Sequence, residues 1–477
     1  MSQPTKKVFI SGIAWSFVQN ILVKGVTFLI SIILARILMP EDFGLIGMLS
    51  IFIAISQVFI ESGFGEALIQ KVDCNDVDYS TAFFFNIFIS ISVYLLLFFC
   101  APLIASFYHE PKLCSLTRVL ALNIVFGSFN IVQRSKLKRS FNFKALAIVT
   151  FGGVVVGGSS GLILAKLGYG VWALVAQTIS TTIACMFLYP FFTKWHPLFV
   201  ISKESFDYLW NYGSKMLVTG VFSSIQTNIA NILIGRYYKA NQVGYYAKAQ
   251  NLGEMPSQVL FSVFNNVTFP TFCGLQNDRQ KLVLAYKRIL FNTVLVVCPI
   301  IILLSLLSEP IVMLLLTEKW APSIPLLQIL LLARMFLPIG ATHTNLIRSV
   351  GNTKLYMKIY FITGPFALLA IIVAMPWGIK AMVFASLIAA LFSYTVPAIV
   401  SGRMFGYSFF RQIYDWRKII ISLLLMSIGV YIWTIIFSGY FVQLIGGLVL
   451  GLLIYFFSCH CFRLIDKELF MMIKNRL

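Results

Sequence analysis

The stretch Leu34-Ala-Arg-Ile-Leu-Met-Pro-Glu-Asp-Phe-Gly44 joins two long apolar segments near the start of the chain. A second stretch, from Ile234-Gly-Arg236 to Val243-Gly244, joins two later apolar segments, and its matching residues lie 200 positions further on. Both stretches read apolar residue, small residue, Arg, and then an apolar residue followed by Gly. Gly170-Val-Trp-Ala-Leu-Val175 likewise matches Gly378-Ile-Lys-Ala-Met-Val383 at an offset of 208. The chain therefore contains an internal repeat.

Fourteen apolar segments fill the chain and are separated by short loops. About 20 apolar residues cross the hydrocarbon core of a bilayer as a helix, so the sequence predicts an all-α integral membrane protein with 14 transmembrane helices. The predicted spans, numbered 1 to 14 in chain order, cover residues 9–35, 43–65, 81–107, 115–133, 145–166, 170–190, 209–235, 244–269, 286–307, 324–346, 356–375, 378–402, 417–437 and 441–462.

The repeat divides these spans into two six-helix lobes and a final pair. We expect an N-terminal lobe at 1–190 with spans 1–6, a cytoplasmic linker at 191–208, a C-terminal lobe at 209–402 with spans 7–12, and spans 13–14 with a cytoplasmic tail at 403–477. An even number of spans per repeat gives both lobes the same orientation, so the predicted pseudo-two-fold axis runs along the membrane normal. Paired lobes of this kind build transporters, with the substrate near the midplane between the repeats.

Basic residues are distributed unequally between the two sides of the predicted membrane. Of the 37 Lys and Arg residues, 25 lie at the termini and in alternate loops, 7 lie in the other loops, and 5 lie inside spans. Basic loops stay in the cytoplasm, so both termini are predicted to be cytoplasmic. The net charge of +20 fits attraction to the inner leaflet better than nucleic acid binding, because the charges lie at helix ends.

Motifs of soluble enzymes are weak in this sequence. Gly157-Gly-Ser-Ser-Gly161 matches the G-x-S-x-G nucleophile elbow, but that motif needs a strand-turn-helix context, and this stretch lies inside span 5. Gly153, Gly157 and Gly161 lie four residues apart, which predicts close helix packing. No phosphate-binding loop occurs, and the eight cysteines are not spaced as metal ligands. We expect a protein that is not an enzyme, with no catalytic residue, metal or cofactor.

Charges inside the spans are the candidate functional residues, because they are costly in a bilayer and usually face a cavity. Lys24 and Arg334 lie near the middle of spans 1 and 10, and no acidic residue lies three or four positions from either. Lys215, Arg118 and Lys248 lie nearer to the ends of spans 7, 4 and 8. For these three, extension of the side chain to the headgroups is an equal alternative.

Two acidic residues, Glu254 in span 8 and Glu61 near the inner end of span 2, are candidates for ion coupling. An ion pair between Lys248 and Glu254 is an alternative, although a spacing of six does not place them on one helix face. Cations outnumber acids inside the spans, so the sequence predicts a site for an anionic substrate. Arg binds phosphate through two parallel hydrogen bonds, and Lys acts as a point charge.

Three stretches also carry a resemblance to a known family. They are Leu34–Gly44 after span 1, Glu61-Ser-Gly-Phe-Gly-Glu-Ala-Leu-Ile-Gln70 closing span 2, and Thr317-Glu-Lys-Trp-Ala-Pro-Ser-Ile-Pro-Leu-Leu-Gln328 opening span 10. Together with the count of spans, they resemble the polysaccharide-transport branch of the multidrug/oligosaccharidyl-lipid/polysaccharide exporter superfamily. This branch contains the Wzx-like flippases of bacterial O-antigen, capsule and exopolysaccharide synthesis, and the resemblance covers the whole chain.

The resemblance implies a flippase in the bacterial cytoplasmic (inner) membrane. Its substrate would be an undecaprenyl-pyrophosphate-linked polysaccharide repeat unit, moved from the cytoplasmic to the periplasmic leaflet by alternating access. The implied partners are this lipid-linked oligosaccharide, membrane lipids and, as candidates, a polysaccharide polymerase and glycosyltransferases, but no nucleic acid.

Two alternatives remain open. A cation-coupled multidrug exporter of the same superfamily would need deep acidic groups, and only Glu254 qualifies in the sequence. A non-transporting membrane scaffold of a glycan-synthesis complex would gain nothing from deep charges, which are costly to insert.

The predicted orientation can be tested by labelling single cysteines in a chain without its eight native ones. Cysteines replacing Lys138 or Arg411 should react with a membrane-impermeant thiol reagent only after the membrane is disrupted. Cysteines replacing Lys239 or Lys319 should react in intact cells once any outer membrane is permeable, because the basic loops lie on the opposite side. Labelling of the first pair in sealed cells would contradict the orientation.

Overall fold

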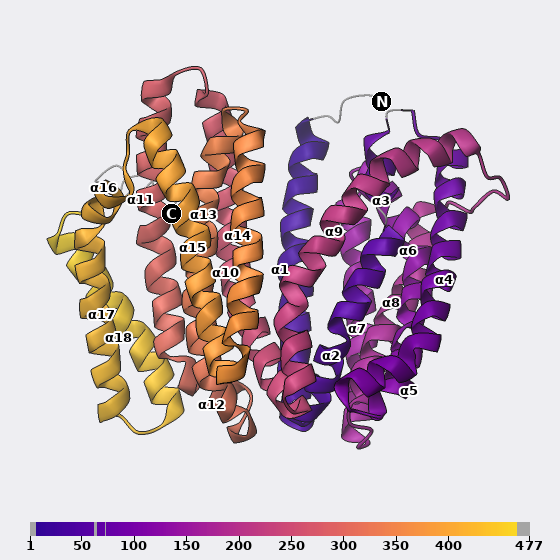
Figure 1. The fold of residues 1–477 in the computed structure, drawn as a ribbon, viewed down its shortest axis with the longest axis horizontal. Coiled ribbons are helices and arrows are strands. Elements are labelled where there is room, and N and C mark those ends of the chain that lie inside the picture. The colour runs from indigo at the N-terminus through magenta and orange to yellow at the C-terminus, as the bar shows by residue number, and fades with distance from the viewer. Residues whose placement is uncertain (1–5, 62–63, 72, 465–477) are drawn as a thin grey trace. The chain divides into compact units, whose positions relative to one another are not determined.

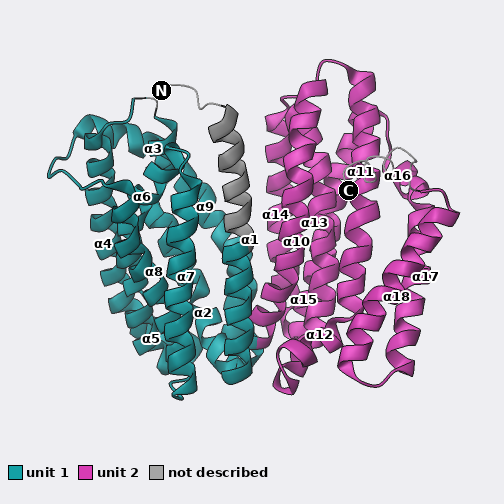
Figure 2. Ribbon diagram, turned by 180° about the vertical axis from the view of Figure 1, so that it is seen from behind, with its two compact units in different colours: residues 1–244 teal, residues 245–477 magenta. Residues whose placement is uncertain are grey.

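The computed structural model describes residues 6–61, 64–71 and 73–464, with the backbone alone described for residues 6–21 and Lys215. All regular secondary structure within these residues is helical. The chain divides into two compact units, unit 1 at Met1–Gly244 and unit 2 at Tyr245–Leu477 (Figure 2).

Unit 1 is a bundle of long helices with short connections (Figure 1). Its helices are α1 (Lys6–Ile37), α2 (Pro40–Glu61), α3 (Phe64–Gln70), α4 (Asp76–Tyr108), α5 (Lys112–Leu120), α6 (Leu122–Arg139), α7 (Phe143–Lys166), α8 (Trp172–Thr193) and α9 (Lys203–Tyr237).

Unit 2 begins inside α10 and is also entirely helical in its described part. Its elements are α10 (Ala240–Leu275), α11 (Arg279–Leu306), α12 (Ser308–Leu315), the 3₁₀ turn η1 (Glu318–Ser323), α13 (Ile324–Ser349), α14 (Thr353–Ala374), the 3₁₀ turn η2 (Met375–Trp377), α15 (Ile379–Phe405), α16 (Phe409–Asp415), α17 (Arg417–Ile436) and α18 (Tyr440–Cys461).

The predicted all-helical membrane fold is confirmed, but the count of 14 spans is not. Twelve helical segments of the described chain are long and apolar enough to cross a membrane. Helices α1 and α10 coincide with predicted spans 1 and 8 but are not among the twelve. Side chains of α1 are described only from Leu22 onward, and α10, although 36 residues long, carries polar residues such as Gln250, Asn251 and Glu254. For these two helices, membrane crossing stays a prediction.

The glycines of α7 form the packing face that their spacing predicts. A Cβ atom on Gly157 would lie 1.8 Å from Thr181 Oγ1 and 2.5 Å from the carbonyl oxygen of Gln177, both on α8. A Cβ atom on Gly153 would lie 2.4 Å from Cys185 Sγ. Helices α7 and α8 therefore approach so closely that only glycine fits, which confirms the prediction.

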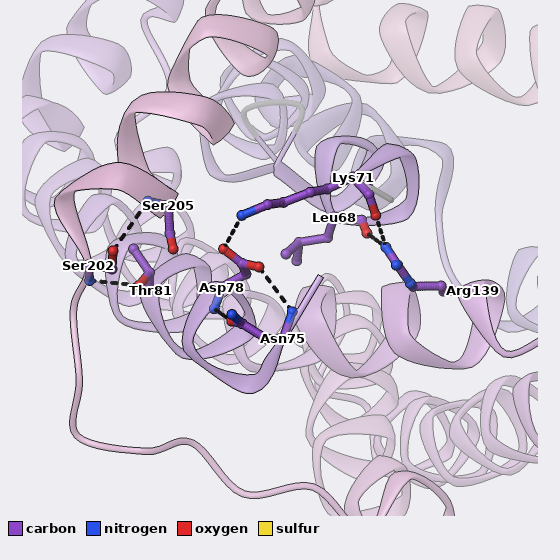
Figure 3. A network of polar contacts seen from close by, with 8 residues as sticks. All are labelled: Leu68, Lys71, Asn75, Asp78, Thr81, Arg139, Ser202 and Ser205. Atoms are coloured by element: carbon purple, nitrogen blue, oxygen red, sulfur yellow. Dashed lines mark hydrogen bonds and ion pairs between the residues drawn. The ribbon is translucent and has the colours of Figure 1, made fainter. Parts of the chain in front are cut away.

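A polar network surrounds Asp78, which is fully buried in the first turn of α4 (Figure 3). Lys71 Nζ donates to Asp78 Oδ1 at 2.6 Å. The side chains of Asn75 and Asp78 each accept a hydrogen bond from the backbone N–H of the other, which forms a capping box. Arg139 on α6 donates to the carbonyl oxygens of Leu68, at 2.7 Å, and of Lys71. The network thus joins α3, α4 and α6.

The segment between α8 and α9 is attached to the same end of α4. The backbone N–H groups of Leu198 and Ser202 donate to the hydroxyls of Ser80 and Thr81, each at 3.0 Å, and the ring of Trp195 is buried. Helix α9 packs against α2, α3 and α4. These contacts agree with the extent of unit 1, which runs to Gly244. The lobes at 1–190 and 209–402 were inferred from the sequence repeat, and they stay a prediction.

Helices α17 and α18 pack against each other and against α11 and α12 of unit 2 (Figure 1). A separate buried polar cluster lies at one end of α11. Tyr286 Oη lies 2.7 Å from His343 Nδ1 and 3.1 Å from Ser401 Oγ, and Gln412 Nε2 donates to it at 3.3 Å. One hydroxyl thus connects α11, α13, α15 and α16.

The α7–α8 contact predicts a position-specific effect of a single methyl group. Gly157→Ala should lower the thermal unfolding temperature, because an added methyl group in a tight contact costs about 1–3 kcal/mol. Gly152→Ala is the matched control on the same helix, since its Cβ would meet only the end of the Leu188 side chain, at 2.9 Å. Equal unfolding temperatures of the two purified variants would contradict the packing argument.

Candidate functional site

The structure pairs the deep cation Arg334 with an acidic residue from another helix. Arg334 Nη2 on α13 donates to Glu254 Oε1 on α10 at 2.5 Å, and the two side chains are 28% and 35% exposed. The charge of Arg334 is therefore offset within the protein. Sequence reasoning missed this partner because the residues are 80 positions apart.

The Arg334–Glu254 pair has unused hydrogen-bonding capacity. A guanidinium carries five N–H donors in a fixed fork, and within the described residues Arg334 makes one hydrogen bond, the one to Glu254. The side chain of Arg334 is also partly exposed. This arrangement can bind a second oxyanion, such as a phosphate or carboxylate group, alongside or instead of Glu254.

Lys24 is the second deep cation predicted from the sequence. It lies on α1 with its side chain exposed, and it makes no ion pair with any residue that the structure describes. Lys24 belongs to unit 1 and Arg334 to unit 2, so their joint contact with one substrate stays a prediction.

The three shallower cations have different surroundings. Arg118 Nε donates to the carbonyl oxygen of Phe98 at 3.4 Å, and its guanidinium lies 4.5 Å from the centre of the Phe98 ring. Lys248 is buried, with its ammonium group 6.0 Å from the centre of the Trp320 ring. The side chain of Lys215 lies outside the described residues. A substrate-binding role for each of the three stays a prediction.

Glu61, the other predicted coupling residue, also pairs with an arginine from a distant helix. Its Oε1 accepts hydrogen bonds from Arg134 Nη2 at 2.9 Å and from Gln57 Nε2 at 3.3 Å. Both side chains of the ion pair are about 40% exposed, so solvent screens the attraction and the pair contributes little to stability. An ion-coupling role of Glu61 stays a prediction.

Amide side chains inside the helices make hydrogen bonds that sequence reasoning missed. Ser50 Oγ on α2 donates to Asn228 Oδ1 on α9 at 3.0 Å and accepts from Asn231 Nδ2 at 3.4 Å. In unit 2, Asn345 Nδ2 on α13 donates to Asn265 Oδ1 on α10 at 2.8 Å. Such bonds join membrane helices. The clustering of Asn and Gln in spans 7 and 8 was the signal available in the sequence.

An all-helical fold with apolar spans and charges inside them defines a polytopic membrane protein of the transporter type. The chain belongs to the polysaccharide biosynthesis protein family (Polysacc_synt_3), whose sequence profile matches residues 33–325. The predicted resemblance to the polysaccharide-transport branch of the exporter superfamily is thereby confirmed.

Named relatives and a solved structure agree with this family. The chain is 27% identical to the succinoglycan biosynthesis transport protein ExoT of Rhizobium meliloti (strain 1021), over 72% of this chain and 70% of the relative. It is 23% identical to the lipopolysaccharide biosynthesis protein WzxC of Escherichia coli (strain K12), over 72% and 68%. The lipid II flippase MurJ, in an inward closed conformation, shares the fold with a TM-score of 0.73 at 18% identity, over 95% of this chain and 98% of MurJ.

The ion pair predicts coupled effects of its two members on stability. Glu254→Gln and Arg334→Gln should each lower the thermal unfolding temperature in detergent, because each leaves one charge without its partner. The double variant should lose less free energy of unfolding than the sum of the two single losses. The difference, which is the interaction free energy of the pair, should be about 0.5–3 kcal/mol. Strictly additive losses in this double-mutant cycle would show that the two charges do not interact.

Proposed function

We propose that this protein is a flippase for undecaprenyl-pyrophosphate-linked polysaccharide repeat units, such as those of O-antigen, capsule or exopolysaccharide. It moves them from the cytoplasmic to the periplasmic leaflet of the bacterial inner membrane, with both of its termini in the cytoplasm. The observation that carries this proposal is the partly exposed guanidinium of Arg334 in an apolar helix, in a chain of a polysaccharide biosynthesis family. The transport and flippase names of its relatives support it.

Such a substrate needs polar groups in the protein that replace its hydration while it crosses the membrane, and the guanidinium of Arg334 is such a group. A sugar pyrophosphate that enters hydrocarbon loses its hydration, at roughly several kcal/mol for each polar group. A guanidinium at mid-depth replaces part of that hydration with charge-assisted hydrogen bonds. The polyprenyl tail needs no such site, because it stays in the bilayer during transfer.

Glu254 has a defined place in this mechanism. In the absence of substrate it neutralises Arg334, which spares the empty protein an uncompensated charge in the membrane. A pyrophosphate group carries more negative charge than a carboxylate, so it competes for the same donors when it arrives. Glu254 is then displaced and becomes available for a proton or cation, which gives a route for coupling substrate binding to ion binding.

The multidrug-exporter alternative is less well supported by the same contact. A cationic drug needs an unneutralised acidic group, and Glu254 is paired with Arg334 at 2.5 Å. Neither residue is exposed by more than about a third, so the pairing is not a loose surface contact. A scaffold without transport gains no benefit from a charge pair held at this depth.

Substitution of the two deep cations tests the proposal. A Lys24→Gln, Arg334→Gln double variant should insert normally yet abolish surface glycan, with lipid-linked repeat units accumulating on the cytoplasmic face. Lys24→Arg should retain part of the activity, whereas Arg334→Lys should lose more, because lysine cannot make two parallel hydrogen bonds to phosphate. Surface glycan and lipid-linked intermediates are measured in cells that lack the native copy.

Lys166→Gln provides the matched control, since it removes an exposed cation at the end of α7 and should leave export unchanged. Normal glycan export from a well-expressed double variant would refute the proposed role of Lys24 and Arg334.

A further inference from the structure

Helix α16 connects two helices of unit 2 that are long and apolar enough to cross a membrane (Figure 1). Helix α15 ends at Phe405 and α17 begins at Arg417, so only residues 406–416 separate them. A connection this short keeps α16 at the end of the two spans, where the lipid headgroups of a bilayer begin. The surroundings of α16 therefore include lipid as well as water and protein.

One face of α16 is fixed to the interior of unit 2. Gln412 is fully buried, and its Nε2 donates to Tyr286 Oη at 3.3 Å and to the carbonyl oxygen of Tyr407 at 3.0 Å. Phe409 and Trp416 lie three and four positions from Gln412, which places them on the same side. Trp416 is buried, and Phe409 packs against the hydrophobic core of unit 2. The helix is thus held in one orientation.

The opposite face of α16 carries large apolar side chains that other parts of the protein leave uncovered. Phe410 is 80% exposed, Tyr414 is 62% exposed and Ile413 is 39% exposed. These three residues, the exposed patch, are three or four positions apart or adjacent and share one side of the helix. An apolar patch on an element that is itself held in place marks a surface for a membrane or a partner.

Basic residues accompany the exposed patch. Arg411 and Arg417 are both exposed and lie on the same side of the chain as the patch. The guanidinium of Arg417 lies 3.9 Å from the centre of the Tyr414 ring, and its Nη1 donates to the Tyr414 carbonyl oxygen at 3.0 Å. Asp415, the acidic residue of α16, accepts a hydrogen bond from Tyr407 Oη at 2.8 Å. The outward face of α16 therefore combines aromatic surface with positive charge.

This combination fits the surface of a membrane that contains anionic lipids. Aromatic side chains are enriched at the boundary between hydrocarbon and headgroups, and basic residues next to a membrane attract anionic headgroups. The two neighbouring spans place both kinds of side chain at that depth. A protein partner is the alternative occupant of the same face, and the depth of the exposed patch in a bilayer distinguishes the two.

We propose that α16 and the start of α17 form a binding surface for anionic phospholipids. The exposed patch enters the leaflet, and Arg411 and Arg417 bind the headgroup phosphates. In the proposed topology the basic loops face the cytoplasm, so this leaflet is the inner one. The surface is separate from Arg334 and goes beyond the proposed function, because it needs no transported substrate. Through Gln412 it is attached to the core of unit 2.

A spin label in the exposed patch tests whether α16 enters a membrane. Ile413→Cys is labelled in a full-length chain without its eight native cysteines and reconstituted into vesicles of equal parts phosphatidylcholine and phosphatidylglycerol. The label should collide more with oxygen, which concentrates in hydrocarbon, than with a water-soluble nickel chelate. Asn277→Cys, in the exposed polar stretch after α10, is the control and should show the reverse. Preferential collision of label 413 with nickel would show that α16 faces water, as a protein-docking surface would, and would overturn the proposal.

A second measurement tests the two arginines. Retention of phosphatidylglycerol by the purified full-length protein is titrated by native mass spectrometry, with phosphatidylcholine as the neutral comparison. The Arg411→Gln, Arg417→Gln double variant should retain the anionic lipid about tenfold less tightly or worse, since each basic residue near a membrane surface contributes about fivefold. Retention of phosphatidylcholine should be unchanged.

The Lys166→Gln, Lys380→Gln double variant is the matched control. It removes the same charge from two exposed positions, at the end of α7 and at the start of α15, the end of α15 opposite to α16. It should retain phosphatidylglycerol as the unaltered protein does. Equal retention by the arginine variant and the unaltered protein would overturn the proposal, and if the arginine variant does not fold, the label at position 413 still decides. Neither measurement uses a glycan, so failure of the proposed transport function would leave both results unchanged.

Discussion

A polar group placed in hydrocarbon must find its partner inside the protein, and this constraint underlies the whole structure. Backbone amides satisfy it by forming helices, since a helix pairs every interior N–H with a carbonyl of its own segment. The described chain is accordingly helical throughout its regular structure. Side-chain charges satisfy the constraint across helices, as Arg334 does with Glu254.

The same constraint connects structure to transport. In the proposed mechanism, the charge of Arg334, which Glu254 neutralises at rest, is neutralised by a phosphate of the substrate instead. The exchange needs a pair that is accessible yet not fully solvated, and the partial exposure of Arg334 and Glu254 meets that condition. A fully buried pair would hold its partners too strongly to exchange, and a fully exposed one would be screened by water.

Close packing at glycines is the second feature that shapes the structure. Membrane helices associate by close packing rather than by exclusion from water. In α7 the glycines at 153 and 157 allow α8 to pack closely against the α7 backbone. Gly44 in α2 and Gly244 in α10, which the repeat relates, also meet closely, since a Cβ atom on Gly44 would lie 1.8 Å from the carbonyl oxygen of Ala240.

The sequence by itself determined the helical membrane class, the repeat, the family resemblance and the packing role of the α7 glycines. Each follows from local composition or from residues at fixed spacing along one helix. The sequence also marked Lys24 and Arg334 as deep cations. Only the tertiary structure paired Arg334 with Glu254 and brought Gly44 against Gly244. Such contacts join residues 80 and 200 positions apart, and their geometry is set by how helices pack, which no pattern along a single helix encodes.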